Sequence, residues 1–142
     1  MIVVVIIGLL AALAIPAFQR VQRASANARA VNDFRIFAQA FEIYNTQNGR
    51  WPPNAGNGVV PAGMSGDFKE DTWKAPATVL GGRWNWDFNR PGFVAGVSIS
   101  GYTVSDAQLA EIDAKLDDGD LTTGNFQKTS AGPDRATYIL EM

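Results

Sequence analysis

The 142-residue chain contains neither cysteine nor histidine. Their absence excludes disulfide scaffolds, zinc sites built on Cys or His ligands, and nucleophile systems in which Cys or Ser works with His. Paired carboxylates for glycoside hydrolysis would need a cleft and a defined separation, and the sequence indicates neither. We therefore expect a protein that is not an enzyme.

Charged side chains are missing from the start of the chain, and the first of them is Arg20. Residues 1–18 carry only apolar side chains apart from Gly8 and Pro16. An α-helix of 18 residues is about 27 Å long, slightly shorter than the hydrocarbon core of a bilayer at about 30 Å. The segment therefore predicts a marginal membrane span.

A strong basic surplus is also missing, since the net charge is −2. Residues 1–50 carry five arginines against two acidic residues, and residues 51–142 carry seven basic against twelve acidic residues. We expect no nucleic-acid partner, because the phenylalanines between the arginines are better explained as core. Contact between the basic segment of one copy and the acidic surface of another is a second interpretation of this asymmetry.

The apolar N-terminus has three interpretations. A cleaved signal sequence is favoured by the small residues of Ala12-Leu13-Ala14, but no basic residue precedes the apolar run. A buried core helix is the second interpretation, but a domain of this size could hardly cover a helix that is apolar around its whole circumference. The third interpretation is a stem, because the run continues without a break into an amphipathic helix. Pro16 and Gly8 weaken that helix locally and mark where it would bend or unwind on assembly.

The segment MIVVVIIGLLAALAIPAFQRVQ closely resembles the N-terminal stem of type IV pilins and type II secretion pseudopilins over residues 1–23. Gly8 and Pro16 stand at the family spacing. A looser resemblance extends through Tyr44 and Asn48-Gly49-Arg50-Trp51-Pro52, which is similar to the helix-ending stretch of pseudopilins. Family members carry a basic leader, a cleavage site and a glutamate before this point, so we expect such residues upstream.

The resemblance implies a structural subunit of a type IV pilus-like filament, assembled through its apolar helix. Its partners would be copies of itself, the inner membrane before assembly, and pilus or secretion machinery, and the assembled filament would be extracellular. The assembly residues would be Ile2, Val3, Val4, Val5, Ile6, Ile7, Gly8, Leu9, Leu10, Leu13, Ile15, Pro16 and Phe18. A pseudopilin in a periplasmic pseudopilus is the alternative within the family, and a monomeric membrane-anchored binding module is an alternative of another class.

The orientation in the membrane has two opposite indications. Arg20 and Arg23 directly follow the apolar run and taken alone would place the rest of the chain in the cytoplasm. The family resemblance implies that the head lies outside, with a basic leader on the other flank, and we follow the resemblance.

The stem is expected to continue over residues 21–48. Val31, Phe34 and Phe41 follow one helix face together with Ala38, while Asn27, Arg35, Gln39 and Glu42 lie largely away from it. The helix should end at Asn48, because Gly49 suits the left-handed position after a helix and two prolines follow.

Residues 49–142 are expected to form a globular head, which gives an α+β, pilin-like fold. Residues 51–80 predict an irregular connection with a helical turn near 67–71. The alternation of residues 83–88, the turn at 89–92 and the run 93–100 predict a hairpin, with further strands at 126–129 and 137–141. Ser105 and Gln108 predict a capping box that begins a helix ending near Leu116. The sheet should pack Trp84 and Trp86 on the stem residues Phe34, Phe37 and Phe41.

Two polar or aromatic groups in the head invite a binding function. The acidic residues Asp117, Asp118 and Asp120 are a weak calcium candidate, since hard oxygen ligands suit that ion and the resemblance implies calcium in a C-terminal loop. The EF-hand spacing is absent, and we otherwise expect no cofactor. Trp51, Trp73, Trp84 and Trp86 would suit a glycan-binding platform, but we expect most of them to pack between sheet and stem.

Overall fold

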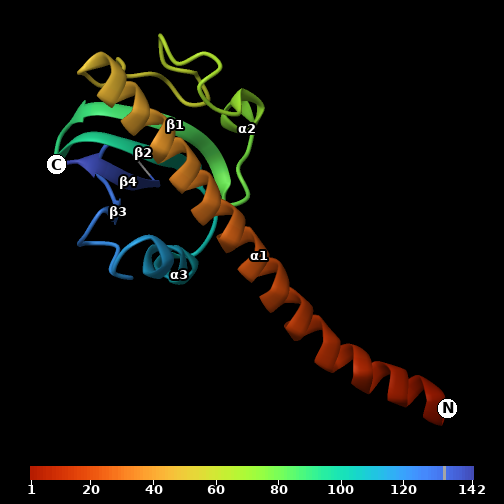
Figure 1. Ribbon diagram of the computed structural model, residues 1–142. Coiled ribbons are helices and arrows are strands. Elements are labelled where there is room, and N and C mark those ends of the chain that lie inside the picture. Colours follow the sequence, from red (N-terminus) through yellow and green to blue (C-terminus); the bar gives the residue numbers. More distant parts are fainter. Residues whose placement is uncertain (133) are drawn as a thin grey trace.

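The computed structural model describes residues 1–132 and 134–142. Its elements are α1 (Ile2–Asn48), α2 (Glu70–Lys74), β1 (Gly81–Arg90), β2 (Phe93–Tyr102), α3 (Asp106–Leu116), β3 (Phe126–Lys128) and β4 (Arg135–Glu141). The C-terminal part of α1 is embedded in the head, and its N-terminal part extends far beyond it (Figure 1). The long helix with an antiparallel sheet confirms the predicted α+β fold.

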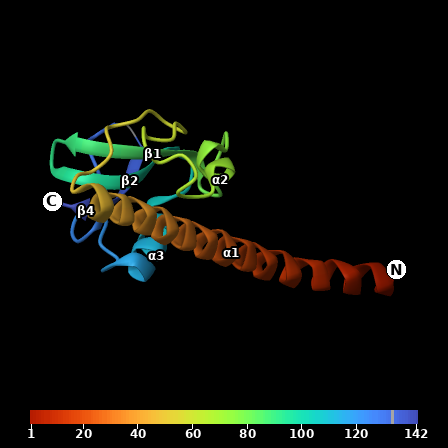
Figure 2. The ribbon, with the colours of Figure 1, turned by 45° about the horizontal axis from the view of Figure 1, so that its top comes forward.

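The stem helix α1 is continuous through Pro16 and ends where the sequence predicts. Gly49 adopts a left-handed conformation with φ of 66°, and its amide donates to the carbonyl of Asn45 at 2.8 Å. Of its 47 residues, only those from Asn27 onward include buried positions. Figure 2 shows the same division from another direction, with the sheet and α3 around one end of the helix.

The sheet has four antiparallel strands in the order β1-β2-β4-β3. The predicted hairpin is confirmed but longer, because pairing continues from Arg90↔Phe93 at the turn to Gly81↔Tyr102. Pro91 and Gly92 form the connection. Gly92 has a φ of 97°, which glycine adopts without steric strain because it has no Cβ. The last strand begins at Arg135, two residues before the predicted start.

The core between sheet and stem is aromatic, as predicted. Phe41 stacks on Trp86 with ring centroids 3.8 Å apart and planes inclined by 7°. Phe34 and Phe37 each meet Trp84 edge to face at 4.8 Å. These five side chains are at most 1% exposed. Burial of large rings is the main favourable term of a head this small.

The tryptophans do not form an exposed platform. Trp73, Trp84 and Trp86 are at most 1% exposed, and Trp51 is half-buried against the core. The indole of Trp86 donates to the carbonyl of Pro52 at 3.0 Å, and that of Trp73 to the carbonyl of Val59 at 2.9 Å. The rings thus anchor the irregular connection to the sheet.

The face of the sheet opposite the stem is polar and yet buried, which the alternating pattern did not predict. Asp87 is 0% exposed and accepts hydrogen bonds from Arg135 and Ser98, both at 2.5 Å. Thr129 shares a hydrogen bond with Thr137 at 2.8 Å, and Gly132 lies against the guanidinium of Arg135. A buried carboxylate is tolerable here because an ion pair and a hydroxyl compensate it.

The two short helices differ from their predictions in detail. α2 begins at Glu70, three residues after the start of the predicted turn, and its buried residue is Trp73. At α3 the Ser105 side chain accepts the amide of Gln108 at 3.3 Å, as in a capping box. The Gln108 side chain does not return to Ser105, because it donates to Asn27 on the stem at 2.8 Å.

Candidate functional site

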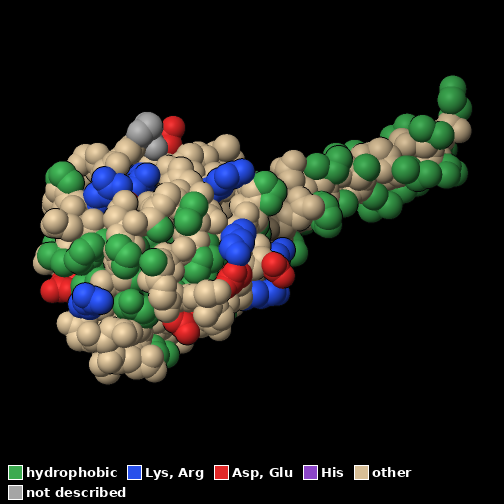
Figure 3. All heavy atoms as spheres, turned by 90° about the horizontal axis from the view of Figure 1, so that it is seen from above, with side chains coloured by type: hydrophobic (Ala, Val, Ile, Leu, Met, Phe, Trp, Pro, Cys, Tyr) green, Lys and Arg blue, Asp and Glu red, His purple; other side chains and the backbone are tan. Residues whose placement is uncertain are grey.

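The N-terminal part of α1 is an apolar surface that packs against no other element among residues 1–132 and 134–142. It is the one helix in the described part of the chain that is long and apolar enough to cross a membrane, with a mean hydropathy of 2.6 in its best window and none of that window buried. The large predicted assembly side chains from Ile2 to Phe18 are each between 50% and 77% exposed. In Figure 3 this part of the stem carries hydrophobic side chains and shows neither blue nor red.

An exposed apolar surface of this extent indicates an interaction site, because soluble monomers rarely leave so large a patch in water. The predicted weak points lie within it. A side chain added at Gly8 would meet no other group within 4 Å, and Pro16 sits inside the helix. The surface therefore offers close approach to another helix or to lipid.

The outward side of the stem remains partly apolar beside the head. Ile36 and Ile43 are 44% and 56% exposed and stand seven residues apart, which places them on one helix face. Val21 is also exposed, at 65%. The apolar surface thus continues as scattered positions along the face that points away from the sheet.

A polar clamp fixes the stem to α3 where the stem leaves the head. Both carboxylate oxygens of Glu111 accept from Arg23, at 2.8 and 3.0 Å, and the Asn27 amide donates to Glu111 at 2.8 Å. Arg35 donates to the carbonyl of Lys115 at 2.7 Å. Asn27 is 2% exposed, so its predicted position away from the packed face is wrong. It is buried by α3, whose position no local pattern reveals.

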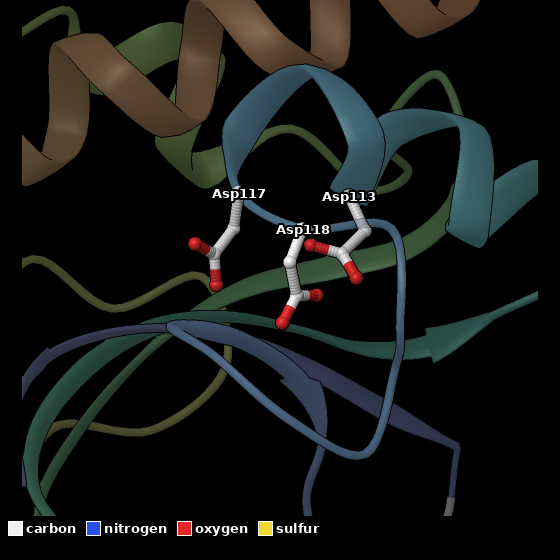
Figure 4. Close-up of side chains that lie close together, drawn as sticks. All are labelled: Asp113, Asp117 and Asp118. Atoms are coloured by element: carbon white, nitrogen blue, oxygen red, sulfur yellow. The ribbon is translucent and has the colours of Figure 1, made fainter.

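The acidic candidate forms a cluster of different composition from the predicted one. Carboxylate oxygens of Asp113, Asp117 and Asp118 lie within 4.8 Å of one another. The three side chains come from the end of α3 and the residues just after it, and gather on one side of the backbone (Figure 4). Asp120 is not in the cluster: its carboxylate accepts from the amide of Thr122 at 3.0 Å and from the hydroxyl of the same residue at 2.7 Å.

Asp113 is the residue that sequence reasoning missed. It is 0% exposed, and neither carboxylate oxygen has a hydrogen-bond partner in the described part of the chain. Burial, followed by the repulsion of Asp118, raises the pKa of Asp113 to about 6, and the nearby amides of residues 118 and 119 offset only part of this. The spacing of Asp113 and Asp117, one helical turn apart, was the available signal.

The cluster has the donor set of a hard divalent cation. Asp118 already accepts from the amide of Asp120 and the hydroxyl of Thr123, both at 2.8 Å, and Asp117 accepts from the amide of Asn125. Calcium binds carboxylates together with other oxygen ligands, and the buried, unpartnered oxygens of Asp113 are available for such an ion. The residues present therefore fit calcium.

Comparison with known proteins is consistent with the geometry. No protein-family model and no curated protein sequence matches the chain. Among solved structures, the chain is similar to the major type IV pilin PilA1 from Clostridium difficile, with a TM-score of 0.61 and 12% sequence identity over 87% of this chain and 98% of that chain. The chain therefore has the fold of a type IV pilin.

Proposed function

We propose that the protein is a structural subunit of a type IV pilus-like filament, held in the inner membrane before assembly and extracellular afterwards. One observation carries the proposal: the apolar N-terminal part of α1 is exposed, with no partner in the part of the chain that the structure describes. Similarity in fold to a type IV pilin supports it. The stem would rest first in lipid and then among the stems of identical copies.

The physical driving force is burial of apolar surface. Each large apolar side chain buried contributes about 1.5–3 kcal/mol before association costs are subtracted. The heads would coat the outside of the bundle. Between Gly8 and Pro16 the assembled helix is expected to lose hydrogen bonds, because proline already lacks one donor there.

Removal of detergent from the purified chain tests the proposal. We expect regular fibres in negative-stain electron microscopy, with a resolved map showing interrupted helix between Gly8 and Pro16. Material that stays monomeric in plain buffer with its stem intact would contradict a filament subunit. A protein that needs detergent and never assembles would favour the monomeric membrane-anchored module instead.

A pseudopilin in a periplasmic pseudopilus is the second candidate. The acidic cluster favours it, because the resemblance to pseudopilins implies calcium in a C-terminal loop and Asp113, Asp117 and Asp118 lie in such a region. Short filaments that form only with secretion machinery would support this alternative. Long fibres assembled with pilus machinery would support the first.

The proposed function includes a calcium ion held by the acidic cluster. The ion would neutralise carboxylates that otherwise repel one another and would tie the end of α3 to the following loop. Ionisation of Asp113 costs stability without the ion, because the raised pKa means that the native state holds a proton that the unfolded chain has already released. The contribution of Asp113 to metal-free stability should therefore fall as the pH rises from about 4 to about 6.

The variant Asp113→Asn tests the calcium site. We expect calcium to raise the thermal unfolding midpoint of the wild-type head at pH 7 and to leave that of Asp113→Asn unchanged. In the metal-free state the variant should be more stable than wild type, because it removes a buried charge. Asp120→Asn is the matched control, since Asp120 lies outside the cluster, and it should respond to calcium like wild type. Equal responses of wild type and Asp113→Asn would refute the site.

A further inference from the structure

A groove opens between the stem and α3, directly after the apolar part of the stem. Its volume is about 610 Å³, and its walls include Arg20, Arg23 and Ala24 from α1 and Glu111, Ala114 and Lys115 from α3. We call it the stem–head groove. Its two walls are held in place by the clamp of Glu111 on Arg23 and Asn27.

The stem–head groove has a surplus of positive charge. Three cationic side chains line it against one carboxylate, and that carboxylate is already occupied by Arg23 and Asn27. Arg20 and Lys115 are exposed, and their side chains make no hydrogen bond or ion pair with the described residues 1–132 and 134–142. In Figure 3 basic side chains lie beside acidic ones where the stem meets the head. The groove therefore offers two uncommitted cations to an anion.

The position of the groove along the stem selects the anion. With Phe18 at the edge of the hydrocarbon core, Arg20 lies about 3 Å and Arg23 about 7.5 Å further along the helix axis. The polar headgroup layer of a bilayer is about 5–8 Å thick on each side. Both arginines are therefore at the depth of lipid phosphates, and Lys115 lines the same groove from α3.

We propose that the stem–head groove binds the phosphate of an anionic phospholipid while the subunit is in the membrane. Arg20 and Lys115 contact the phosphate oxygens, and the alanines of the walls leave room for the glycerol region of the lipid. A guanidinium suits this role because its fork of N–H donors matches phosphate oxygens. The inference rests on the proposed function, since it requires the stem to lie in a bilayer.

Native mass spectrometry of the full chain in detergent tests the inference, with equal amounts of phosphatidylglycerol and phosphatidylcholine added. Wild type should retain phosphatidylglycerol preferentially. In the double variant Arg20→Gln/Lys115→Gln this preference should fall by about 30-fold, since each cation near an anionic lipid contributes about 1 kcal/mol. Arg50→Gln/Lys69→Gln removes the same charge elsewhere and should keep the wild-type preference.

Each result distinguishes the lipid site from its alternatives. A double variant with unchanged preference, or a control that loses as much, would overturn the inference. Displacement of phosphatidylglycerol by millimolar inorganic phosphate would also overturn it, because the groove would then bind a free anion. If wild type still inserts into bilayers and forms fibres, such failures leave the filament function intact. A wild-type chain that neither inserts nor assembles would instead refute the proposed function.

Discussion

Replacing Leu9 with arginine is expected to abolish filament assembly and to weaken membrane insertion strongly. Leu9 lies near the middle of the apolar stem and is 63% exposed in the isolated subunit. Moving from leucine to arginine at the centre of a membrane helix costs about 3–4 kcal/mol, or a factor of several hundred in the insertion equilibrium. The measurements are carbonate extraction of membranes and the yield of sedimented fibres.

Val59→Arg provides the control for this change. Val59 is an apolar side chain on the head with a comparable exposure of 54%, and its side chain lies outside the core. The same substitution there should leave insertion and fibre yield near wild type. If Leu9→Arg assembles normally, the stem is not the assembly surface, whatever the fold resembles.

The second large effect is expected at Trp86. Trp86→Ala removes a fully buried indole that stacks on Phe41 and donates to the carbonyl of Pro52. Truncation of a buried large aromatic side chain costs about 3–5 kcal/mol, because the cavity collapses only partly. Urea unfolding of the head in detergent, followed by near-ultraviolet circular dichroism, measures this loss of unfolding free energy.

Trp51→Ala separates the packing role from a glycan-binding role. Trp51 is half-buried, and its ring centroid lies 5.5 Å from that of Trp86. We expect its truncation to cost clearly less, about 1–2 kcal/mol, in proportion to the smaller area that it buries. Loss of glycan binding by Trp51→Ala without loss of stability would favour a binding role for Trp51 over a packing role.

Features that depend on residues close together in the sequence could be predicted. The end of α1 at Asn48 follows from Gly49 and the two prolines, and the hairpin follows from alternation around Pro91-Gly92. The role of Ser105 as N-cap follows from its position before an amphipathic run. In each case the chain's local geometry alone decides the outcome.

The acidic cluster shows where local reasoning ends. Counting carboxylates along the chain selected Asp120, whose side chain accepts a hydrogen bond from the amide of Thr122. It missed Asp113 on the preceding helix. Asp113 stands one helical turn after the buried Leu109 and so lies on the same helix face, but how completely it is buried depends on how α3 lies in the head. The calcium proposal therefore depends on tertiary packing.

By itself the sequence determined the long stem, its charge-free N-terminus and the aromatic face that holds the head, because those properties are set by composition and helical or strand periodicity. Only the tertiary structure decided that Asn27 and Asp87 are buried and that Lys115 faces the same groove as Arg20. These arrangements bring together residues that are between 48 positions (Asp87 and Arg135) and 95 positions (Arg20 and Lys115) apart in the sequence. No pattern in neighbouring residues predicts that two such distant residues will be close in space. How far each side chain is exposed to solvent depends on how the helices and the sheet pack against one another.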